Sequence, residues 1–348
     1  MPRRVIAGNL PAPMLAKAEP AFPEGEGWTF EPKWDGFRAI VAADGEGGVR
    51  IVSRDGRPLD RYFPEVVNAV AGHASARFVA DGEIVRIVDG RMAFEDLQLR
   101  LHPAESRVRK LAGEIPASLI LFDLLQDEGT SLLERPLAER RERLSALGKR
   151  LGLPVSPDRL DRVPPGPSLA LAPWTDDAAT ARRWFDDETG LGEDGIVAKR
   201  ADQPYQPGER GWIKVKHRRS ADCVVGGYRV AKNDDGVGSL LLGLYDGDVL
   251  HYVGHTSSFS AAERRRIRAE LAPLEGGVSF PLDRGPGGPS RWSGGRDTDW
   301  VSLEPTLVVE VSFDRLQGGR FRHAATFVRW RTDRDPRSCT FGQLRGEG

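Results

Sequence analysis

The chain has 348 residues, 39% of them hydrophobic and 29% charged, and its formal net charge at pH 7 is −1. This length predicts about two domains. No apolar run approaches the roughly 18–20 residues of a membrane span, and there is no secretory signal, so we expect a cytoplasmic protein with no membrane partner. A charge so close to zero gives no support by itself to a nucleic-acid partner, so any DNA-binding face must come from local clusters of basic residues.

The first part of the chain mixes short strand-like runs with helical stretches, which predicts an α+β domain with antiparallel sheets. Strand signals lie at 28–33, 37–42, 49–54, 78–88, 119–125, 195–200 and 212–217. Helical periodicity marks 64–72, 94–101, 137–151 and 176–189. The charges of 137–151 fall on one face, which we interpret as a solvent-exposed surface with no role in function.

From residue 221 onward the pattern changes to strands, at 223–231, 239–245, 249–256, 306–315 and 325–332. Ser260 and Glu263 form a capping box ahead of one helix at 264–274. Five strands and one helix predict an all-β OB-fold domain, and the alternative is a small barrel without a ligand. The Gly- and Pro-rich segment 281–299 is predicted to be a loop. With a hinge at 217–222, the expected domains are 1–217 and 218–348.

The cysteines, histidines and lysines limit the kinds of metal site, disulfide and nucleophile that the sequence can provide. Cys223 and Cys339 fit no zinc-site or disulfide spacing and are expected to be buried free thiols, and the six histidines show no metal or triad spacing. Lysine is rare among the 50 basic residues, at Lys17, Lys33, Lys110, Lys149, Lys199, Lys214, Lys216 and Lys232. Because an arginine stays protonated near neutral pH while a lysine amine can become a nucleophile, the positions that keep lysine are candidates for chemistry.

The segment 31–38 (EPKWDGFR) places Lys33 at a turn between two strand-like runs, with Asp35 and Arg38 beside it. A lysine amine becomes nucleophilic where neighbouring positive charge disfavours its protonated form. Taken alone, the segment is also compatible with an ordinary hairpin whose charges are solvated.

Five further motifs follow in order: SRDG at 53–56, DGEIV at 81–85, LFD at 121–123, DGIVAK at 194–199 and WIKVK at 212–216. Together with 31–38, this series resembles the covalent nucleotidyltransferases, and among them the ATP-dependent DNA ligases. The sequences of the motifs are most similar to those of bacterial ligase C and of the ligase domain of ligase D. The resemblance implies an adenylation domain of the nucleotidyltransferase (ATP-grasp-like) fold followed by the OB-fold domain.

By this resemblance Lys33 attacks the α-phosphate of ATP and carries AMP. Arg38 and Arg54 present forked donors suited to phosphate or ribose oxygens, first of ATP and later of the 5′-phosphate at the nick. Glu83 matches the carboxylate that holds the ribose, and Phe122 matches the aromatic ring that stacks on adenine. Surface ion pairs for the arginines, a turn role for Glu83 and a core role for Phe122 are the alternatives.

The resemblance implies further nucleotide-binding residues near the start and near the end of the adenylation domain. Glu31 matches the residue that recognises adenine, and Arg210 matches a nucleotide-contacting arginine. Lys214 and Lys216 alternate on one strand, so both point to the same face, as two phosphate-binding groups require. Ordinary solvated strand lysines are the alternative, which the scarcity of lysine disfavours.

The expected metal is Mg²⁺ or Mn²⁺, held by Asp194 and, less securely, by Asp35. The family motif has glutamate before the glycine of DGIVAK, whereas this sequence has Asp194 there and Glu193 before it. A hard divalent ion accepts either carboxylate, although the shorter side chain favours a bridging water.

Residues 329–334 (RWRTDR) resemble the Arg-x-Asp-Lys element of the ligase OB domain, with Arg331, Asp333 and Arg334 in the matching positions. Arg334 stands where lysine is common. The family uses this element to orient pyrophosphate in the first step, and a basic strand end that only touches DNA is the alternative.

The resemblance therefore implies an ATP-dependent DNA ligase that seals 5′-phosphate/3′-hydroxyl nicks in duplex DNA, in repair rather than bulk replication. We expect a minimal monomer at the bacterial nucleoid, without a DNA-binding extension or appended polymerase or nuclease, and with a primase-polymerase as partner. Two other interpretations stay open: an RNA-directed ligase or mRNA-capping guanylyltransferase, which labelled GTP would reveal, and a catalytically inactive DNA-binding module, which would form no lysyl-AMP.

Overall fold

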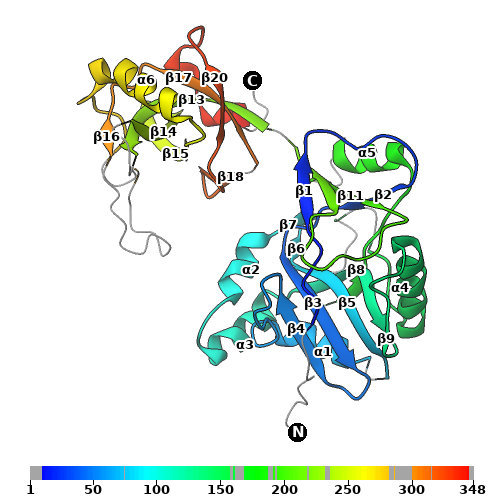
Figure 1. Cartoon of the computed structure of the whole chain (residues 1–348). Coiled ribbons are helices and arrows are strands. Elements are labelled where there is room, and N and C mark those ends of the chain that lie inside the picture. Colours follow the sequence, from blue (N-terminus) through cyan, green and yellow to red (C-terminus); the bar gives the residue numbers. More distant parts are fainter. Residues whose placement is uncertain are drawn as a thin grey trace. The chain divides into compact units, whose positions relative to one another are not determined.

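The computed structural model describes residues 10–73, 75–156, 160, 168–186, 191–192, 194–217, 219–231, 236–281, 286, 300–314 and 316–344. The chain divides into two compact units, Met1–His217 (unit 1) and Arg218–Gly348 (unit 2) (Figure 1). Within the described ranges, no helix is long and apolar enough to cross a membrane.

Unit 1 is built on two sheets. The larger sheet has the strand order β10-β8-β5-β3-β4, with β9 pairing to β8. Its strands are β3 (Phe37–Asp44), β4 (Val49–Ser53), β5 (Arg77–Val85), β8 (Ser118–Asp127), β9 (Thr130–Ser131) and β10 (Leu169–Leu171). The smaller sheet has the order β1-β12-β11-β2, from β1 (Ala16–Glu19), β2 (Trp28–Pro32), β11 (Ile196–Arg200) and β12 (Trp212–Val215). A separate hairpin joins β6 (Ile87–Val88) to β7 (Arg91–Met92).

Alternation along β3 explains why the larger sheet is buried on both faces. Ala39 and Val41 belong to one core cluster and Ile40 and Ala42 to another, as a period of two requires. The helices of this unit are α1 (Pro64–Ala71), α2 (Phe94–Arg100), α3 (Glu105–Glu114), α4 (Leu137–Leu151) and α5 (Ala178–Asp186). α1 packs on β4 and α4 packs on β8 and β10, so these two helices cover the first cluster.

The predicted strands and helices of unit 1 are present, but two details were wrong or missed. The sheets are not wholly antiparallel, because β1 runs parallel to β12 and β10 runs parallel to β8. Both of these edge strands, and also α3, gave no signal in the sequence. A strand of three or four residues carries too little periodicity to be recognised, and its direction is set by the neighbour that pairs with it. Residues 187–189 of the predicted helix 176–189 lie outside the described ranges.

In its described residues, unit 2 is a barrel of five main strands with one helix, which confirms the expected OB-fold domain. Its sheet has the order β15-β14-β13-β17-β20, and a bridge between Thr256 and Ala325 joins the two outer strands. The strands are β13 (Arg219–Val230), β14 (Val237–Asp246), β15 (Val249–Thr256), β17 (Val308–Phe313) and β20 (Thr326–Trp330). Shorter pieces are β16 (Val301–Ser302), β18 (Leu316–Gln317) and β19 (Arg320–Phe321).

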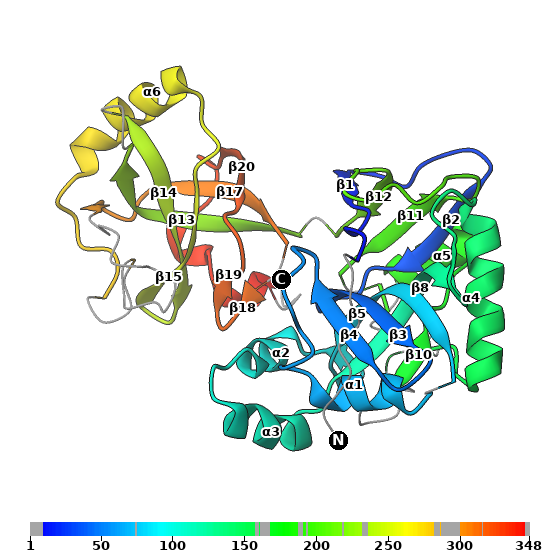
Figure 2. The ribbon, with the colours of Figure 1, turned by 60° about the horizontal axis from the view of Figure 1, so that its bottom comes forward.

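The helix of unit 2, α6 (Ala261–Leu271), packs against β14 and lies at one end of the barrel (Figure 2). Its predicted capping box is present, because Ser260 accepts from the Glu263 amide and Glu263 accepts from the Ser260 amide. A 3-10 turn (Ala272–Leu274) continues the helix, and two more (Pro336–Ser338 and Phe341–Leu344) follow β20. Cys223 and Cys339 are buried free thiols, as predicted.

The hinge predicted at 217–222 is corrected. Residues 219–222 form the start of β13, where Arg219 pairs with Phe313 and Asp222 with Glu310 of β17. The sequence could not show this, because the partner strand lies about 90 residues further along the chain. Of the loop predicted at 281–299, only residues 281 and 286 lie within the described ranges.

Candidate active site

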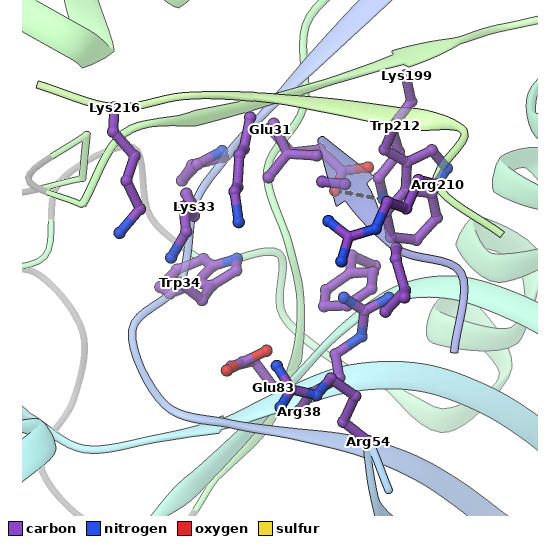
Figure 3. A pocket seen from close by; sticks show the side chains of 16 residues that line it. Glu31, Lys33, Trp34, Arg38, Arg54, Glu83, Lys199, Arg210, Trp212 and Lys216 are labelled. Atoms are coloured by element: carbon purple, nitrogen blue, oxygen red, sulfur yellow. Dashed lines mark ion pairs between the residues drawn. The ribbon is translucent and has the colours of Figure 1, made fainter. Parts of the chain in front are cut away.

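A cleft of about 560 Å³ in unit 1 is lined by side chains from both sheets (Figure 3). It gathers the nine residues predicted to bind or attack the nucleotide. The lining consists of Leu15, Ala16, Glu31, Pro32, Lys33, Trp34, Arg38, Arg54, Glu83, Phe122, Val197, Lys199, Arg210, Trp212, Lys214 and Lys216. Residues spread over about 200 positions of sequence therefore meet in one cavity.

Strand register places the residues of the smaller sheet. Val197 of β11 lies opposite Glu31 of β2 on one side and opposite Lys214 of β12 on the other. Residues opposite each other in neighbouring strands share a face, so this row faces the cleft together. Lys33 and Lys216 lie two positions further along their strand directions and continue the same face.

The larger sheet supplies the facing wall. Arg38 of β3 lies opposite Glu83 of β5, and Phe122 comes from the neighbouring strand β8. Gly36 allows this approach, because a Cβ there would lie 2.0 Å from the carbonyl oxygen of Ile84. The glycine of the Lys-x-Asp-Gly segment is therefore needed for close backbone packing beside Lys33.

Lys33 is held against Asp194 at the smaller-sheet side of the cleft. Its Nζ forms an ion pair with Oδ2 of Asp194, while Nζ of Lys216 lies 3.7 Å from Oδ1. The Lys33 amide donates to the carbonyl oxygen of Gly195 (2.9 Å). Gly195 has φ +110° and no room for a Cβ, which would lie 2.1 Å from the Val215 oxygen. This explains why the carboxylate facing Lys33 is followed by glycine.

Positive charge dominates the cleft. Seven lining residues are cationic and two are acidic, the cations being Lys33, Arg38, Arg54, Lys199, Arg210, Lys214 and Lys216. Burial lowers the pKa of Lys214, and the neighbouring charges of Lys33, Lys216 and Arg210 lower it further. A cleft with these properties attracts a polyanion such as a triphosphate.

Arg38 is fixed by a buried carboxylate. Its Nε and Nη2 donate to the two oxygens of Asp81, each at 2.6 Å, and Tyr205 Oη donates to Asp81 at 2.5 Å. Although burial disfavours the charged guanidinium, Asp81 outweighs it and raises the pKa of Arg38. The guanidinium lies 4.7 Å from the Phe122 ring centroid. In this structure Arg38 is thus oriented by protein groups, with its remaining edge at the cleft.

Glu83 lies beside Arg38 and is half-buried. Burial raises its pKa to about 7, against the opposing effect of Arg38 and Lys33 and with a smaller contribution from Asp81 and Asp35. A carboxylate with such a pKa can donate or accept a hydrogen bond near neutral pH. This suits contact with a neutral hydroxyl group.

Two further residues shape the inner end of the cleft, Lys199 and Trp212, and neither is among the residues predicted for the site. Lys199 is buried, with its Nζ 2.6 Å from Oε2 of Glu31 and 4.1 Å from the Trp212 ring centroid. Burial lowers its pKa, and Glu31 and Asp123 act in the opposite direction. The signal was available, because Lys199 ends the DGIVAK motif and lies two positions beyond Val197 on the same face.

The two carboxylates predicted to bind metal have different positions. Neither is a lining residue of the cleft. Asp194 contacts Lys33 and Lys216, whereas Asp35 is buried, with its amide donating to Met92 Sδ (3.1 Å). Among the described residues, no cluster of three or more His, Cys, Asp or Glu side chains could hold a metal ion. Mg²⁺ needs only one or two protein carboxylates when phosphates and waters complete its shell, so Asp194 fits the chemistry.

In unit 2, the residues predicted for the first step surround Asp222. Arg331 Nη1 lies 2.9 Å from Asp222 Oδ1, and Arg334 Nε lies 3.3 Å from Oδ2. Arg331 also binds Asp333 (2.9 Å), whose pKa this contact lowers to about 2. The three predicted residues therefore form one cluster on the end of β20.

Two family profiles match the chain: "ATP dependent DNA ligase domain" over residues 13–216 and "ATP dependent DNA ligase C terminal region" over residues 233–334. DNA ligase C of Mycobacterium tuberculosis is 47% identical over 348 residues, covering 96% of this chain and 93% of the relative. The multifunctional non-homologous end joining DNA repair protein LigD of the same organism is 32% identical over 325 residues, which is 90% of this chain and 38% of that protein. A solved Lig E DNA ligase has the same fold, with a TM-score of 0.55 at 19% identity over 91% of this chain and 99% of that one.

Proposed function

The chain belongs to the ATP-dependent DNA ligase family, and from this premise we propose that it seals 5′-phosphate/3′-hydroxyl nicks in duplex DNA through an AMP-lysine bond on Lys33. The observation that supports this most is the cationic cleft around Lys33, which combines a lysine amine, phosphate-binding side chains and aromatic walls. Unit 1 is then the adenylation domain and unit 2 the OB domain. The similarity to ligase C and to the LigD repair protein supports a role in DNA repair.

In the first step the Lys33 amine, after losing a proton, attacks the α-phosphorus of ATP. A nitrogen–phosphorus bond forms, the bond between the α-phosphorus and the bridging oxygen breaks, and pyrophosphate leaves. Charge builds up on phosphate oxygens during this displacement, and Lys214, Lys216 and Arg210 are placed to neutralise it. Phe122 and Trp212 provide apolar surface for the base, and Glu83 is placed for the ribose hydroxyls.

We place the divalent ion, Mg²⁺ or Mn²⁺, at Asp194. A bound divalent cation supplies positive charge to the phosphates. Bound there, it would also occupy the carboxylate that pairs with Lys33 in this structure. Asp35 is a weaker candidate, because Asp194, although it does not line the cleft either, contacts the cleft residues Lys33 and Lys216.

In the later steps AMP passes from Lys33 to the 5′-phosphate at the nick, and the 3′-hydroxyl then attacks that phosphate and releases AMP. Arg38 and Arg54 line the cleft and are candidates to hold the 5′-phosphate. The Arg331–Asp333–Arg334 cluster of unit 2 is our candidate for orienting pyrophosphate in the first step. We further propose that the protein acts as a monomer at the nucleoid, with a repair primase-polymerase as partner.

The test is direct. Lys33→Ala should abolish lysyl-AMP formation and lower nick sealing by more than about 10⁴-fold, because the nucleophile is lost. The exposed Lys17 provides the control, and Lys17→Ala should retain both activities. Covalent labelling with α-labelled ATP and GTP is the measurement. Label from GTP alone, or normal labelling of Lys33→Ala, would contradict the proposal.

A further inference from the structure

Behind the cleft, one arginine of α4 reaches the carboxylate that the cleft presents. Nη2 of Arg141 forms an ion pair with Oε1 of Glu31, and the second oxygen of Glu31 binds Lys199 at 2.6 Å. All three side chains are buried, with exposed fractions of 5% for Arg141, 4% for Glu31 and 1% for Lys199. Arg141 itself does not line the cleft.

The neighbouring arginine shows what a purely structural contact on α4 is like. Arg140 satisfies its guanidinium fully, with two bonds to Asp123 (2.8 and 2.9 Å) and bonds to the carbonyl oxygens of Arg135 and Gln203. These contacts fasten α4 to β8 and to the chain that follows β11. The anchoring of the helix is thus accounted for without Arg141.

Arg141 is satisfied only in part. Within the described part of the chain, its buried Nε and Nη1 have no hydrogen-bond partner. The face of its guanidinium lies 4.5 Å from the ring centroid of Trp174, which is 50% exposed. Both residues line a second cavity, of about 820 Å³, between α4 and the start of β2. Because unsatisfied buried donors cost stability, a buried arginine in this position is better explained by its action on Glu31 than by stabilisation of the fold.

The pair that Arg141 holds combines an acceptor with a donor, because Nζ of Lys199 forms an ion pair with Glu31 but makes no hydrogen bond within the described residues. Glu31 offers an acceptor and Lys199, beside it, offers a donor near Trp212 (Figure 3). Nζ of Lys199 also lies 4.5 Å from the Phe122 ring centroid, so the pair stands at the aromatic end of the cleft. Adenine presents an amino donor beside a ring-nitrogen acceptor, which matches this order. Guanine presents a carbonyl acceptor in place of the amino donor, which opposes it.

We propose that Arg141 is a positioning residue for nucleotide selection, which holds Glu31 so that the Glu31–Lys199 pair presents its acceptor and donor to the edge of adenine. This inference rests on the proposed function. Without Arg141, both oxygens of Glu31 become available to Lys199, and the donor and the acceptor then neutralise each other instead of facing the base. Trp174 supports the arrangement by fixing the plane of the guanidinium.

The test uses the full-length protein and measures kcat and KM for lysyl-AMP formation with ATP and with GTP. Arg141→Met should raise the KM for ATP about tenfold, the effect of one misplaced hydrogen bond to a charged group, while kcat changes less than about twofold. The preference for ATP over GTP should fall by a similar factor. Arg141→Lys should recover part of the loss, and Arg143→Met, on the exposed face of the same helix, should have no effect.

A double variant separates positioning from general stabilisation. If Arg141 acts through Glu31, Glu31→Gln should show the same change in KM, and adding Arg141→Met to it should cause no further change. An unchanged KM in Arg141→Met, additive effects in the double variant, or equal losses with ATP and GTP would overturn the inference. If Arg141→Met does not fold, Trp174→Ala should still raise the KM for ATP about two- to threefold, and an unchanged KM there would also overturn it. A wild-type protein that forms no lysyl-AMP would instead refute the proposed function.

Discussion

The cleft of unit 1 and the Asp222 cluster of unit 2 both collect cations, but they balance them differently. In the cleft, seven cationic residues face two glutamates, and Lys33 and Lys216 share one carboxylate, Asp194, whose Oδ1 lies 3.7 Å from Nζ of Lys216. In the cluster, Arg331 and Arg334 share Asp222, and Arg331 also binds Asp333. The cleft therefore has a charge excess that a polyanion can neutralise, whereas the cluster has already neutralised itself.

This difference suggests different requirements for binding phosphate. Cations held together by the fold have their repulsion relieved when a phosphate arrives, so binding needs little rearrangement. Arg334, with 41% of its side chain exposed, must instead leave a carboxylate before it can contact a phosphate. We therefore expect substitutions in the cleft to have larger effects on the first step than substitutions in the cluster.

The strongest test of this difference between the cleft and the cluster is to remove positive charge from the cleft. Lys214→Met should lower the rate of lysyl-AMP formation about 100-fold, because one preorganised cation at the phosphates is lost. Burial, and after it the neighbouring cations, lower the pKa of Lys214 and so disfavour its charge, which means that removing the charge should leave stability unchanged or slightly increased. Lys17→Met, an exposed lysine on β1, is the control. A loss below about threefold would show that the charge excess does not drive the reaction.

A smaller effect is expected in the cluster. Asp222→Asn removes the carboxylate shared by Arg331 and Arg334. Arg334 then no longer has to leave this carboxylate, but both arginines lose the group that orients them, and we expect this loss to dominate and to slow lysyl-AMP formation about tenfold. Sealing of a nick that already carries AMP should be unchanged, since that step needs no pyrophosphate contact. Single-turnover assays of the two steps measure this, with the exposed Glu304→Gln as control. Equal loss in both steps would contradict a role confined to the first.

The smallest effect concerns Glu83 and pH. Its pKa in the folded protein is about 7, against 4.5 for the unfolded chain, so the folded state keeps a proton that the unfolded state releases. Stability without nucleotide should therefore decrease as pH rises from about 4.5 to about 7. Glu83→Gln should flatten this slope and add about 1 kcal/mol above pH 7, allowing for solvent screening. Urea unfolding at several pH values tests this against the exposed Glu134→Gln, and an unchanged slope would contradict it.

Particular residues show how far the sequence could predict the site. The positions from Lys33 to Lys216 were selected by motifs, and strand alternation explains why they meet in one cleft. Neither a motif nor strand alternation indicates a role for Arg141. It lies in helix 137–151, whose charges were interpreted as a solvated face, and that interpretation was wrong for Arg140 and Arg141, which are buried. A charged residue on an amphipathic helix is expected to be exposed unless its partner is known, and here the partner is 110 residues away.

The sequence by itself determined the fold class, the order of most strands and helices and the family, because these depend on local periodicity and on short motifs that can be recognised in the sequence. Only the tertiary structure decided which strands run parallel, where β13 begins, and which carboxylate each cation meets. It placed Asp194 against Lys33, Asp81 against Arg38 and Glu31 between Arg141 and Lys199. The physical reason is that an ion pair depends on distance in space, and contacts between residues that are 43 or more positions apart in the chain leave no periodic trace in the sequence.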